Sequence, residues 1–244
     1  MLRKIALSII SCMLVAIGFA QQITTPEPTE VWEPVARVVT PGMNQAPPSD
    51  AIVLFDGKST KEWKHQDGND IKWTVEDGVL TVNPGTGDIL TRQTFGDAQL
   101  HIEWRTPAKV VGDGQGRGNS GVFLQNRYEV QILDNYQNKT YSNGQAGSIY
   151  KQSIPLVNAC RPPGEWQTYD IIYQAPRFNA DGIKVAPAFV TVIQNGILVQ
   201  NHTEIKGTTE YIGLPKNMAH GDDSIRLQDH GNPVSYRNIW IRRL

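Results

Sequence analysis

This sequence has few cysteines and no large excess of charge of either sign. Its 244 residues include two cysteines, Cys12 and Cys160, which excludes a disulfide-built scaffold and a thiolate metal cluster. The 23 basic and 24 acidic residues form no block of like charge, and the five histidines show no paired metal spacing. These absences argue against a nucleic-acid partner, an acidic lipid partner and a catalytic zinc site. We expect no metal and no other cofactor.

Helical periodicity and long apolar runs are also missing beyond the N-terminus. The one extended apolar run, residues 5–19, follows Arg3-Lys4 and ends in Gly18-Phe19-Ala20, as in a cleaved signal peptide. It falls short of the roughly 20 apolar residues that a membrane span needs. Residues 1–20 are therefore predicted to be a signal peptide. The mature protein is expected to be exported, periplasmic or extracellular, and to have no membrane span.

Ile9-Ile10-Ser11-Cys12 resembles a bacterial lipoprotein cleavage box, so a lipoprotein is the alternative. Removing the signal peptide leaves 21 basic and 24 acidic residues, a net charge of −3, and one cysteine, Cys160. One cysteine cannot form an internal disulfide. We expect Cys160 to be a buried spectator rather than a nucleophile.

Prolines are concentrated directly after the predicted signal peptide. Residues 21–49 hold six of the fifteen: Pro26, Pro28, Pro34, Pro41, Pro47 and Pro48. This composition predicts an extended, partly polyproline-like leader, part of which lies against the domain surface. One globular domain is expected over residues 50–244.

That domain is predicted to consist of short strands separated by turn signals. Asn195-Gly196, between two β-rich runs, is the strongest hairpin signal. Many short strands without helical crossovers or an internal repeat predict an all-β sandwich of two antiparallel sheets. The predicted strands are 73–75, 79–82, 89–91, 99–105, 121–125, 128–133, 167–173, 188–194, 197–199, 224–228 and 237–242.

The strand over residues 128–133 carries the first candidate site. Side chains alternate along a strand, so Glu129 and Gln131 share one face, which we expect to be the exposed face of the sheet. Asp134 points the other way unless a β-bulge turns it back. The spacing Glu-x-Gln-x-x-Asp loosely resembles the catalytic strand of retaining sandwich glycanases. It lacks the second carboxylate about 5–5.5 Å away that a retaining mechanism uses.

Two further clusters contain candidate site residues. Gln228 and His230 alternate near the C-terminus, and Asp229 could orient the His230 imidazole if the following turn brings them together. The alternative is a turn-capping pair. The glycine-rich stretch 112–121 is not in a strand–loop–helix context, so it is interpreted as a flexible loop over a binding groove. Asn119 at its end could hydrogen-bond sugar hydroxyls.

Several motifs, in order, resemble the 3-keto-disaccharide hydrolase family over residues 50–244. They are Leu54-Phe55-Asp56-Gly57-Lys58-Ser59, residues 73–80, 95–105, 118–123, 128–134, Pro163-Gly164-Glu165-Trp166, Leu227-Gln228-Asp229-His230-Gly231 and Arg237-Asn238-Ile239. This chain departs from the family pattern at Val192–Gly196, where relatives carry a His-Trp-x-Asn-Gly hairpin, and at Asp223–Leu227. The first departure removes an aromatic side chain and puts the sugar's identity in doubt.

The resemblance implies a concanavalin-like jelly-roll sandwich and cleavage of glycosides already oxidised at sugar C3. A C3 ketone acidifies the C2 proton, so a base can remove it, C1 can lose its leaving group, and water can then add. Glu129 and His230 are the implied catalytic pair, with the choice of base between them open. The implied substrate-binding residues are Gln131, Asn119, Lys151, Gln228, Asp229 and Arg237. A non-catalytic carbohydrate-binding module and a hydrolase of unmodified glycans remain the alternatives.

Overall fold

The structure, a computed structural model, describes residues 23–244. The chain divides into two units between Val38 and Val39. In the first unit, residues 23–38 contain one turn of 3-10 helix, η1 (Glu27–Thr29), which follows Pro26. The Thr29 Oγ1 hydroxyl donates to the Pro26 carbonyl at 2.9 Å and holds this turn. The predicted signal peptide lies outside the described residues.

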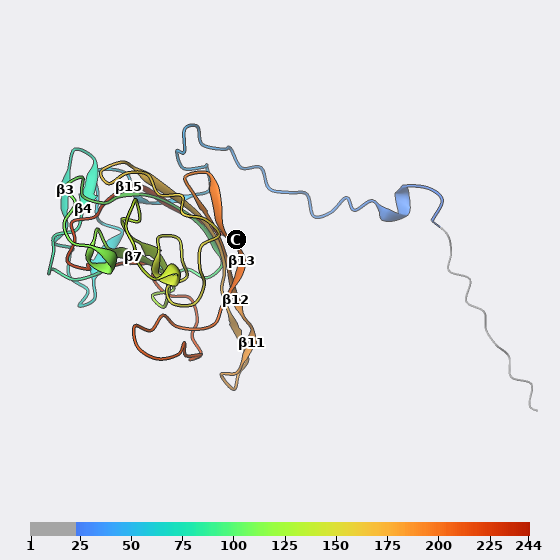
Figure 1. The fold of residues 1–244 in the computed structure, drawn as a ribbon. Coiled ribbons are helices and arrows are strands. Elements are labelled where there is room, and N and C mark those ends of the chain that lie inside the picture. The colour runs from blue at the N-terminus through green and yellow to red at the C-terminus, as the bar shows by residue number, and fades with distance from the viewer. Residues whose placement is uncertain (1–22) are drawn as a thin grey trace, which may run out of the picture. The chain divides into compact units, whose positions relative to one another are not determined.

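The second unit contains an eight-stranded antiparallel sheet, here called the large sheet (Figure 1). Its strand order is β13-β12-β9-β6-β15-β4-β3, and β1 pairs with β15. The strands are β1 (Ile52–Phe55), β3 (Thr74–Glu76), β4 (Val79–Thr81), β6 (Ala98–Arg105), β9 (Gln167–Gln174), β12 (Ala188–Gln194), β13 (Ile197–Ile205) and β15 (Ser235–Arg243).

A five-stranded antiparallel sheet, here called the small sheet, has the order β2-β5-β14-β7-β8. Its strands are β2 (Trp63–His65), β5 (Ile89–Thr91), β14 (Arg226–Leu227), β7 (Ser120–Leu124) and β8 (Tyr128–Ile132). A separate hairpin pairs β10 (Arg177–Phe178) with β11 (Lys184–Ala186).

The inner faces of the two sheets form one hydrophobic core. Val130 and Ile132 of β8 and Ile102 and Trp104 of β6 all belong to one buried cluster. Burying such side chains contributes about 1.5–3 kcal/mol each, which drives the two sheets together. Hydrogen bonds also cross between them, since the Tyr169 hydroxyl of β9 donates to the carbonyl oxygen of Gln131 in β8 at 2.7 Å. The predicted two-sheet antiparallel sandwich is confirmed.

The Asn195-Gly196 hairpin forms as predicted. Gln194 and Ile197 pair across it, and Asn195 and Gly196 have φ angles of 53° and 80°. Both positive φ values are those of a type I′ turn, whose twist matches that of the flanking strands.

Four strands of the structure do not appear among the predicted ones. β1, β2, β10 and β11 have four residues or fewer. Such short runs show too little alternation to be recognised, and they become strands because β15, β5 or each other supply the hydrogen-bonding partner.

Helical structure is confined to single turns near the loops. Besides η1, the described part of the chain has η2 (Gly114–Gly116) and η3 (Ser142–Gly144). None of the helices over residues 23–244 is long and apolar enough to cross a membrane.

Candidate functional site

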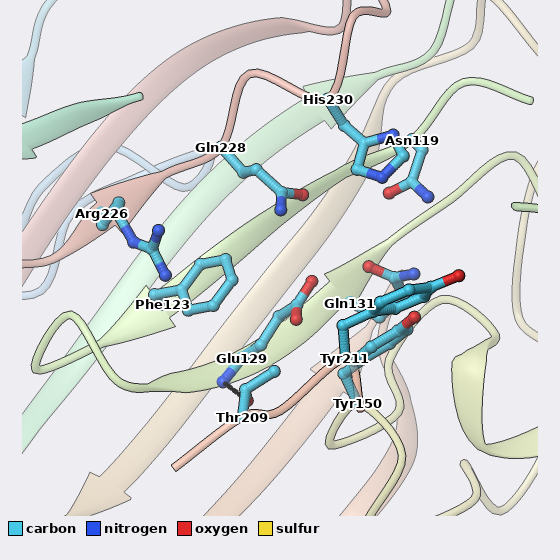
Figure 2. A pocket seen from close by; sticks show the side chains of 10 residues that line it. All are labelled: Asn119, Phe123, Glu129, Gln131, Tyr150, Thr209, Tyr211, Arg226, Gln228 and His230. Atoms are coloured by element: carbon cyan, nitrogen blue, oxygen red, sulfur yellow. Dashed lines mark hydrogen bonds between the residues drawn. The ribbon is translucent and has the colours of Figure 1, made fainter. Parts of the chain in front are cut away.

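The outer face of the small sheet forms the floor of a cavity of about 270 Å³. This volume lies near the lower end of small-molecule sites, which span roughly 300–1,000 Å³. Figure 2 shows the ten lining side chains, which come from three strands and from loops that rise around them. They are Asn119, Phe123, Glu129, Gln131, Tyr150, Thr209, Tyr211, Arg226, Gln228 and His230.

Glu129 lies at the floor of this cavity on β8. Its partner across the ladder is Phe123 of β7, and the next residue on the same face of β7 is Gly121. A Cβ atom added at Gly121 would lie 2.6 Å from Glu129 Oε1. A side chain at position 121 would therefore occupy the space that the carboxyl uses.

The Glu129 carboxyl is buried, with 4% of the residue exposed, and makes no hydrogen bond within the described chain. Burial raises its pKa to about 8, against an opposing effect of the Arg226 charge. An acid in this state is a proton-transfer group poised near neutral pH. The expectation that Glu129 and Gln131 lie on an exposed face is wrong, because loops cover that face.

Arg226 of β14 balances part of the charge near Glu129. Its guanidinium lies 3.6 Å from the centre of the Phe123 ring, and Nη1 pairs with Asp88 at 2.7 Å. The Arg226 Nε atom is buried without a hydrogen-bond partner. Burial outweighs the Arg226 charge, and the Asp88 charge adds a smaller raising effect, so the pKa of the Glu129 carboxyl stays raised.

The glycine-rich loop contributes one wall, as its interpretation as a groove loop anticipates. The Gln131 amide Nε2 donates to Gln115 Oε1 of this loop at 3.0 Å, and Asn119 Nδ2 donates to the Gln115 carbonyl at 2.7 Å. Gln131 Oε1 is buried without a partner. A ligand hydroxyl would satisfy this acceptor, since unpaired buried polar atoms cost free energy.

Two tyrosines from loops that the sequence patterns did not single out form another wall, next to Gln131 (Figure 2). Tyr150 is 9% exposed and its hydroxyl is 2.6 Å from that of Tyr141, whereas Tyr211 is 73% exposed. Burial raises the pKa of the Tyr150 hydroxyl well above its ordinary value. Flat apolar rings beside polar groups suit the faces and hydroxyls of sugars.

The loop that carries Tyr211 is tied to β8. The Thr209 hydroxyl accepts a hydrogen bond from the Glu129 amide at 2.9 Å, and the Thr209 amide donates to the Arg127 carbonyl at 2.9 Å. Lys151 Nζ donates to the Tyr211 carbonyl at 2.6 Å and lies 4.4 Å from the Tyr211 ring centre. The predicted site residue Lys151 thus supports the wall and does not itself line the cavity.

Gln228 and His230 close the cavity above Glu129, as their alternation predicts. Figure 2 shows the Gln228 amide and the Glu129 carboxyl pointing toward one another, with His230 next to Asn119. Gln228 Oε1 has no hydrogen-bond partner, and the exposed His230 ring makes no hydrogen bond to the described residues. Both side chains are therefore available to a ligand.

Asp229 does not lie in the cavity and does not orient His230. Its carboxylate accepts hydrogen bonds from the Gly87 amide at 3.0 Å and the Gly231 amide at 2.9 Å. The alternative of a turn-capping pair therefore holds for Asp229 but not for His230. Neighbouring side chains of an extended segment point in opposite directions, so His230 lines the cavity and Asp229 does not.

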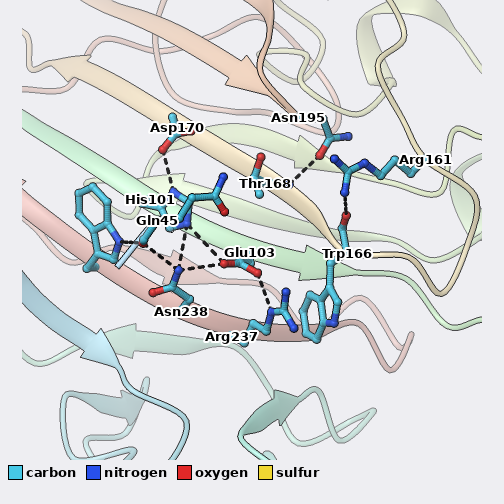
Figure 3. Close-up of polar contacts among 11 residues, drawn as sticks. Gln45, His101, Glu103, Arg161, Trp166, Thr168, Asp170, Asn195, Arg237 and Asn238 are labelled. Atoms are coloured by element: carbon cyan, nitrogen blue, oxygen red, sulfur yellow. Dashed lines mark hydrogen bonds and ion pairs between the residues drawn. The ribbon is translucent and has the colours of Figure 1, made fainter. Parts of the chain in front are cut away.

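Arg237 lies on the large sheet, in a network separate from the cavity lining (Figure 3). Its Nε atom pairs with Glu103 at 2.5 Å, and its guanidinium lies 4.2 Å from the Trp166 ring centre. Glu103 also accepts from Asn238 Nδ2 at 2.8 Å, and buried His101 contacts Asp170 at 2.7 Å. These contacts give Arg237 a structural role in the large sheet.

Two other sequence expectations concern acidic and thiol groups. Asp134 pairs with Arg117 Nε at 2.7 Å, and no bulge returns it to Glu129. Cys160 is partly buried against the core, where burial raises the pKa of its thiol to about 11 and Gln194 Nε2 donates to its sulfur. Its thiolate form is thus disfavoured.

The departure from the family pattern at Val192–Gly196 falls outside the cavity. Val192 and Gln194 are fully buried in β12 of the large sheet. The second departure contributes Arg226 to the lining.

The arrangement supplies one titrating carboxyl, one imidazole, three amides and two tyrosine rings around one cavity. Glu129 is the only carboxylate among the residues that line it, which does not suit a two-carboxylate glycosidase mechanism. No cluster of three or more His, Cys, Asp or Glu side chains within residues 23–244 is arranged to hold a metal ion.

Comparison with known proteins gives a family match over most of the chain. The sequence model described as "3-keto-alpha-glucoside-1,2-lyase-like domain" matches residues 50–242. A curated protein of Bacteroides thetaiotaomicron named 3-keto-disaccharide hydrolase is 26% identical over an alignment of 246 residues, covering 79% of this chain and 78% of that protein.

Solved structures of Parabacteroides distasonis proteins described as candidate glycosyl hydrolases are also similar. One is 57% identical, with a TM-score of 0.87, and covers 90% of this chain and 97% of its own. Another is 22% identical, with a TM-score of 0.59, and covers 80% of this chain and 94% of its own, which shows a shared fold.

Proposed function

Because the chain belongs to the family of 3-keto-alpha-glucoside-1,2-lyase-like domains, we propose that it cleaves glycosides whose sugar carries a ketone at C3. It is an enzyme that acts on glycosidic bonds, in keeping with its relative named 3-keto-disaccharide hydrolase. The observation that carries the finer proposal is the Glu129 carboxyl, which is buried, unpaired and has its pKa raised to about 8.

Glu129 is the base in this proposal. It removes the proton from C2 of the sugar, and the electron pair of that bond passes to the C3 carbonyl as an enolate. A base with a raised pKa is stronger once ionised, and general-base catalysis of this kind contributes about 10²–10⁴-fold. The free Gln228 amide, which faces Glu129, is the donor best placed to hydrogen-bond the enolate oxygen (Figure 2).

His230 is the acid. When the enolate collapses, a double bond forms between C1 and C2, the C1–O bond breaks, and the leaving oxygen takes a proton from the imidazolium. Water then adds hydroxide to C1 and a proton to C2, so the net reaction is hydrolysis. Asn119 and Gln131 hold sugar hydroxyls, and the Tyr150 and Tyr211 rings also line the cavity.

One assay separates this proposal from its alternatives. The purified protein is incubated with one glucoside in its native and its 3-keto form, and the released aglycone is measured. Turnover of the 3-keto form alone supports the proposal. Cleavage of the native form indicates a hydrolase of unmodified glycans, and binding without turnover of either indicates a carbohydrate-binding module.

Export to the periplasm or the medium completes the proposal. It depends on the N-terminal sequence pattern of residues 1–20. N-terminal sequencing of the protein from fractionated cells tests it, since a start at Gln21 indicates a cleaved signal peptide. A lipid-modified start at Cys12 would instead identify a lipoprotein.

A further inference from the structure

A second cavity, of about 290 Å³, is lined in part by two loops that also contribute to the first, the glycine-rich loop and the loop that follows β14. Gly118 and Gly231 line it, and the residues next to them in the chain, Asn119 and His230, line the first cavity. The Gly118 amide donates to Asn232 Oδ1 at 2.8 Å, which ties the two loops together. The two cavities therefore adjoin at the His230–Asn119 edge.

The surface of this second cavity is largely apolar. Its lining includes Pro107, Val110, Val111 and Pro233. Val110 is 46% exposed and Val111 is 66% exposed, so both present apolar surface that water covers in the free protein. Apolar side chains around a concave site favour an apolar ligand, because burial removes that surface from water.

Each polar side chain here, with one exception, already has a hydrogen-bond or ion-pair partner in the protein. Arg117 pairs with Asp134 at 2.7 Å and donates to the Tyr136 carbonyl at 3.0 Å. Asn232 accepts from Gly118 and donates to the His230 carbonyl at 3.0 Å. Lys109 is the exception among the described lining residues, since it makes no hydrogen bond or ion pair.

We propose that this second cavity holds an aromatic aglycone of the glycoside whose sugar occupies the first cavity. This inference rests on the proposed function. A second sugar would bring several hydroxyls to a surface on which Lys109 is the one polar side chain without a protein partner, and unpaired polar groups are costly to bury. A flat aromatic ring fits prolines and valines, and the Lys109 ammonium can lie against its face.

The position of His230 agrees with this placement. It lies on the loop shared by the two cavities, between the sugar and the aglycone. The glycosidic oxygen joins these two parts, so an imidazole at that edge is suited to protonate the leaving phenol.

The test compares the wild type with Val111→Asp and with a matched control, Val185→Asp. Val185 is 63% exposed, lies in β11 and is not part of either cavity. The measurement is kcat/KM on the 3-keto forms of phenyl glucoside, methyl glucoside and a glucose disaccharide. The dissociation constants of unmodified phenyl and methyl glucoside are measured as well, by isothermal titration calorimetry, which needs no turnover. Val110→Asp serves as a second variant if Val111→Asp does not fold.

The wild type is expected to have a higher kcat/KM on the phenyl substrate than on the disaccharide. Val111→Asp is expected to lower the ratio of kcat/KM on the phenyl substrate to kcat/KM on the methyl substrate about tenfold, as for a lost contact in an apolar pocket. The Val185→Asp ratio stays at the wild-type value. Phenol and methanol differ as leaving groups, but this difference is the same in every variant, so it cancels when the ratios of the variants are compared. A ratio that Val111→Asp leaves unchanged overturns the inference. If no 3-keto substrate turns over, the proposed function fails, and the ratio of the phenyl and methyl glucoside dissociation constants in each variant still decides the aglycone site.

Discussion

Replacing Glu129 by Gln separates the chemical role of this carboxyl from its effect on stability. Glutamine has nearly the same shape but neither titrates nor accepts a proton. With a folded-state pKa of about 8, the wild type has about one tenth of Glu129 ionised at pH 7 and about nine tenths at pH 9. If ionised Glu129 is the base, wild-type kcat/KM on a nitrophenyl 3-keto-glucoside, whose leaving group needs no proton from His230, rises about tenfold over this range, with its midpoint near pH 8.

Glu129→Gln is expected to lower kcat about 10²–10⁴-fold and to abolish the rise of kcat/KM with pH. The expected effect on stability goes in the other direction, since the variant is more stable than the wild type at high pH. Because the folded-state pKa is raised from 4.5 to about 8, folded protein binds more protons than unfolded protein between these values. Wild-type stability therefore falls relative to the variant as pH rises through this window. Above pH 8 the difference is on the order of 5 kcal/mol, at about 1.4 kcal/mol per pKa unit.

Two assays measure these effects. Initial rates from pH 6 to 9.5 give the kinetic midpoint, and urea unfolding of both proteins at pH 5 and pH 9 gives the free energies of unfolding. A wild-type rate that falls through pH 8 would mean that Glu129 acts as the acid and His230 as the base. A stability difference between the two proteins that is the same at pH 5 and at pH 9 would refute the raised pKa itself.

Three further substitutions test the parts around Glu129. His230→Ala is expected to lower kcat about 10²–10⁴-fold for alkyl leaving groups and much less for nitrophenols, which are acidic enough to leave as anions, with an unchanged unfolding midpoint because His230 is exposed; equal losses for both leaving groups would contradict its role as acid. Gly121→Ala places a methyl group 2.6 Å from Glu129 Oε1, so we expect a loss of about 1–3 kcal/mol in unfolding free energy together with reduced activity; full activity would show that the carboxyl does not need this space. Thr209→Val removes the acceptor of the Glu129 amide and loosens the Tyr211 loop, so KM should rise with a stability loss of about 1–3 kcal/mol; an unchanged KM would show that this loop does not contact substrate.

The residues of the site were partly predictable because a strand fixes which side chains share a face. Glu129 with Gln131, and Gln228 with His230, follow from the two-residue period alone, and the structure places all four on one cavity. The two-sheet architecture followed in the same way from alternation and turn residues. The wall that contains Thr209 and Tyr211 did not, because these residues lie in a loop with no period.

What the sequence by itself determined was therefore local: the strands, the Asn195-Gly196 hairpin and the orientation of side chains along each strand. Only the tertiary structure decided what lies opposite each face. It buried Glu129 beneath loops from residues 112–119 and 207–211 and so raised its pKa, and it placed Arg226 beside Phe123. It also turned Asp229 into a cap and paired Arg237 with Glu103 on the other sheet. A carboxyl's pKa depends on how much water and charge surround it, and those come from segments far away in the chain.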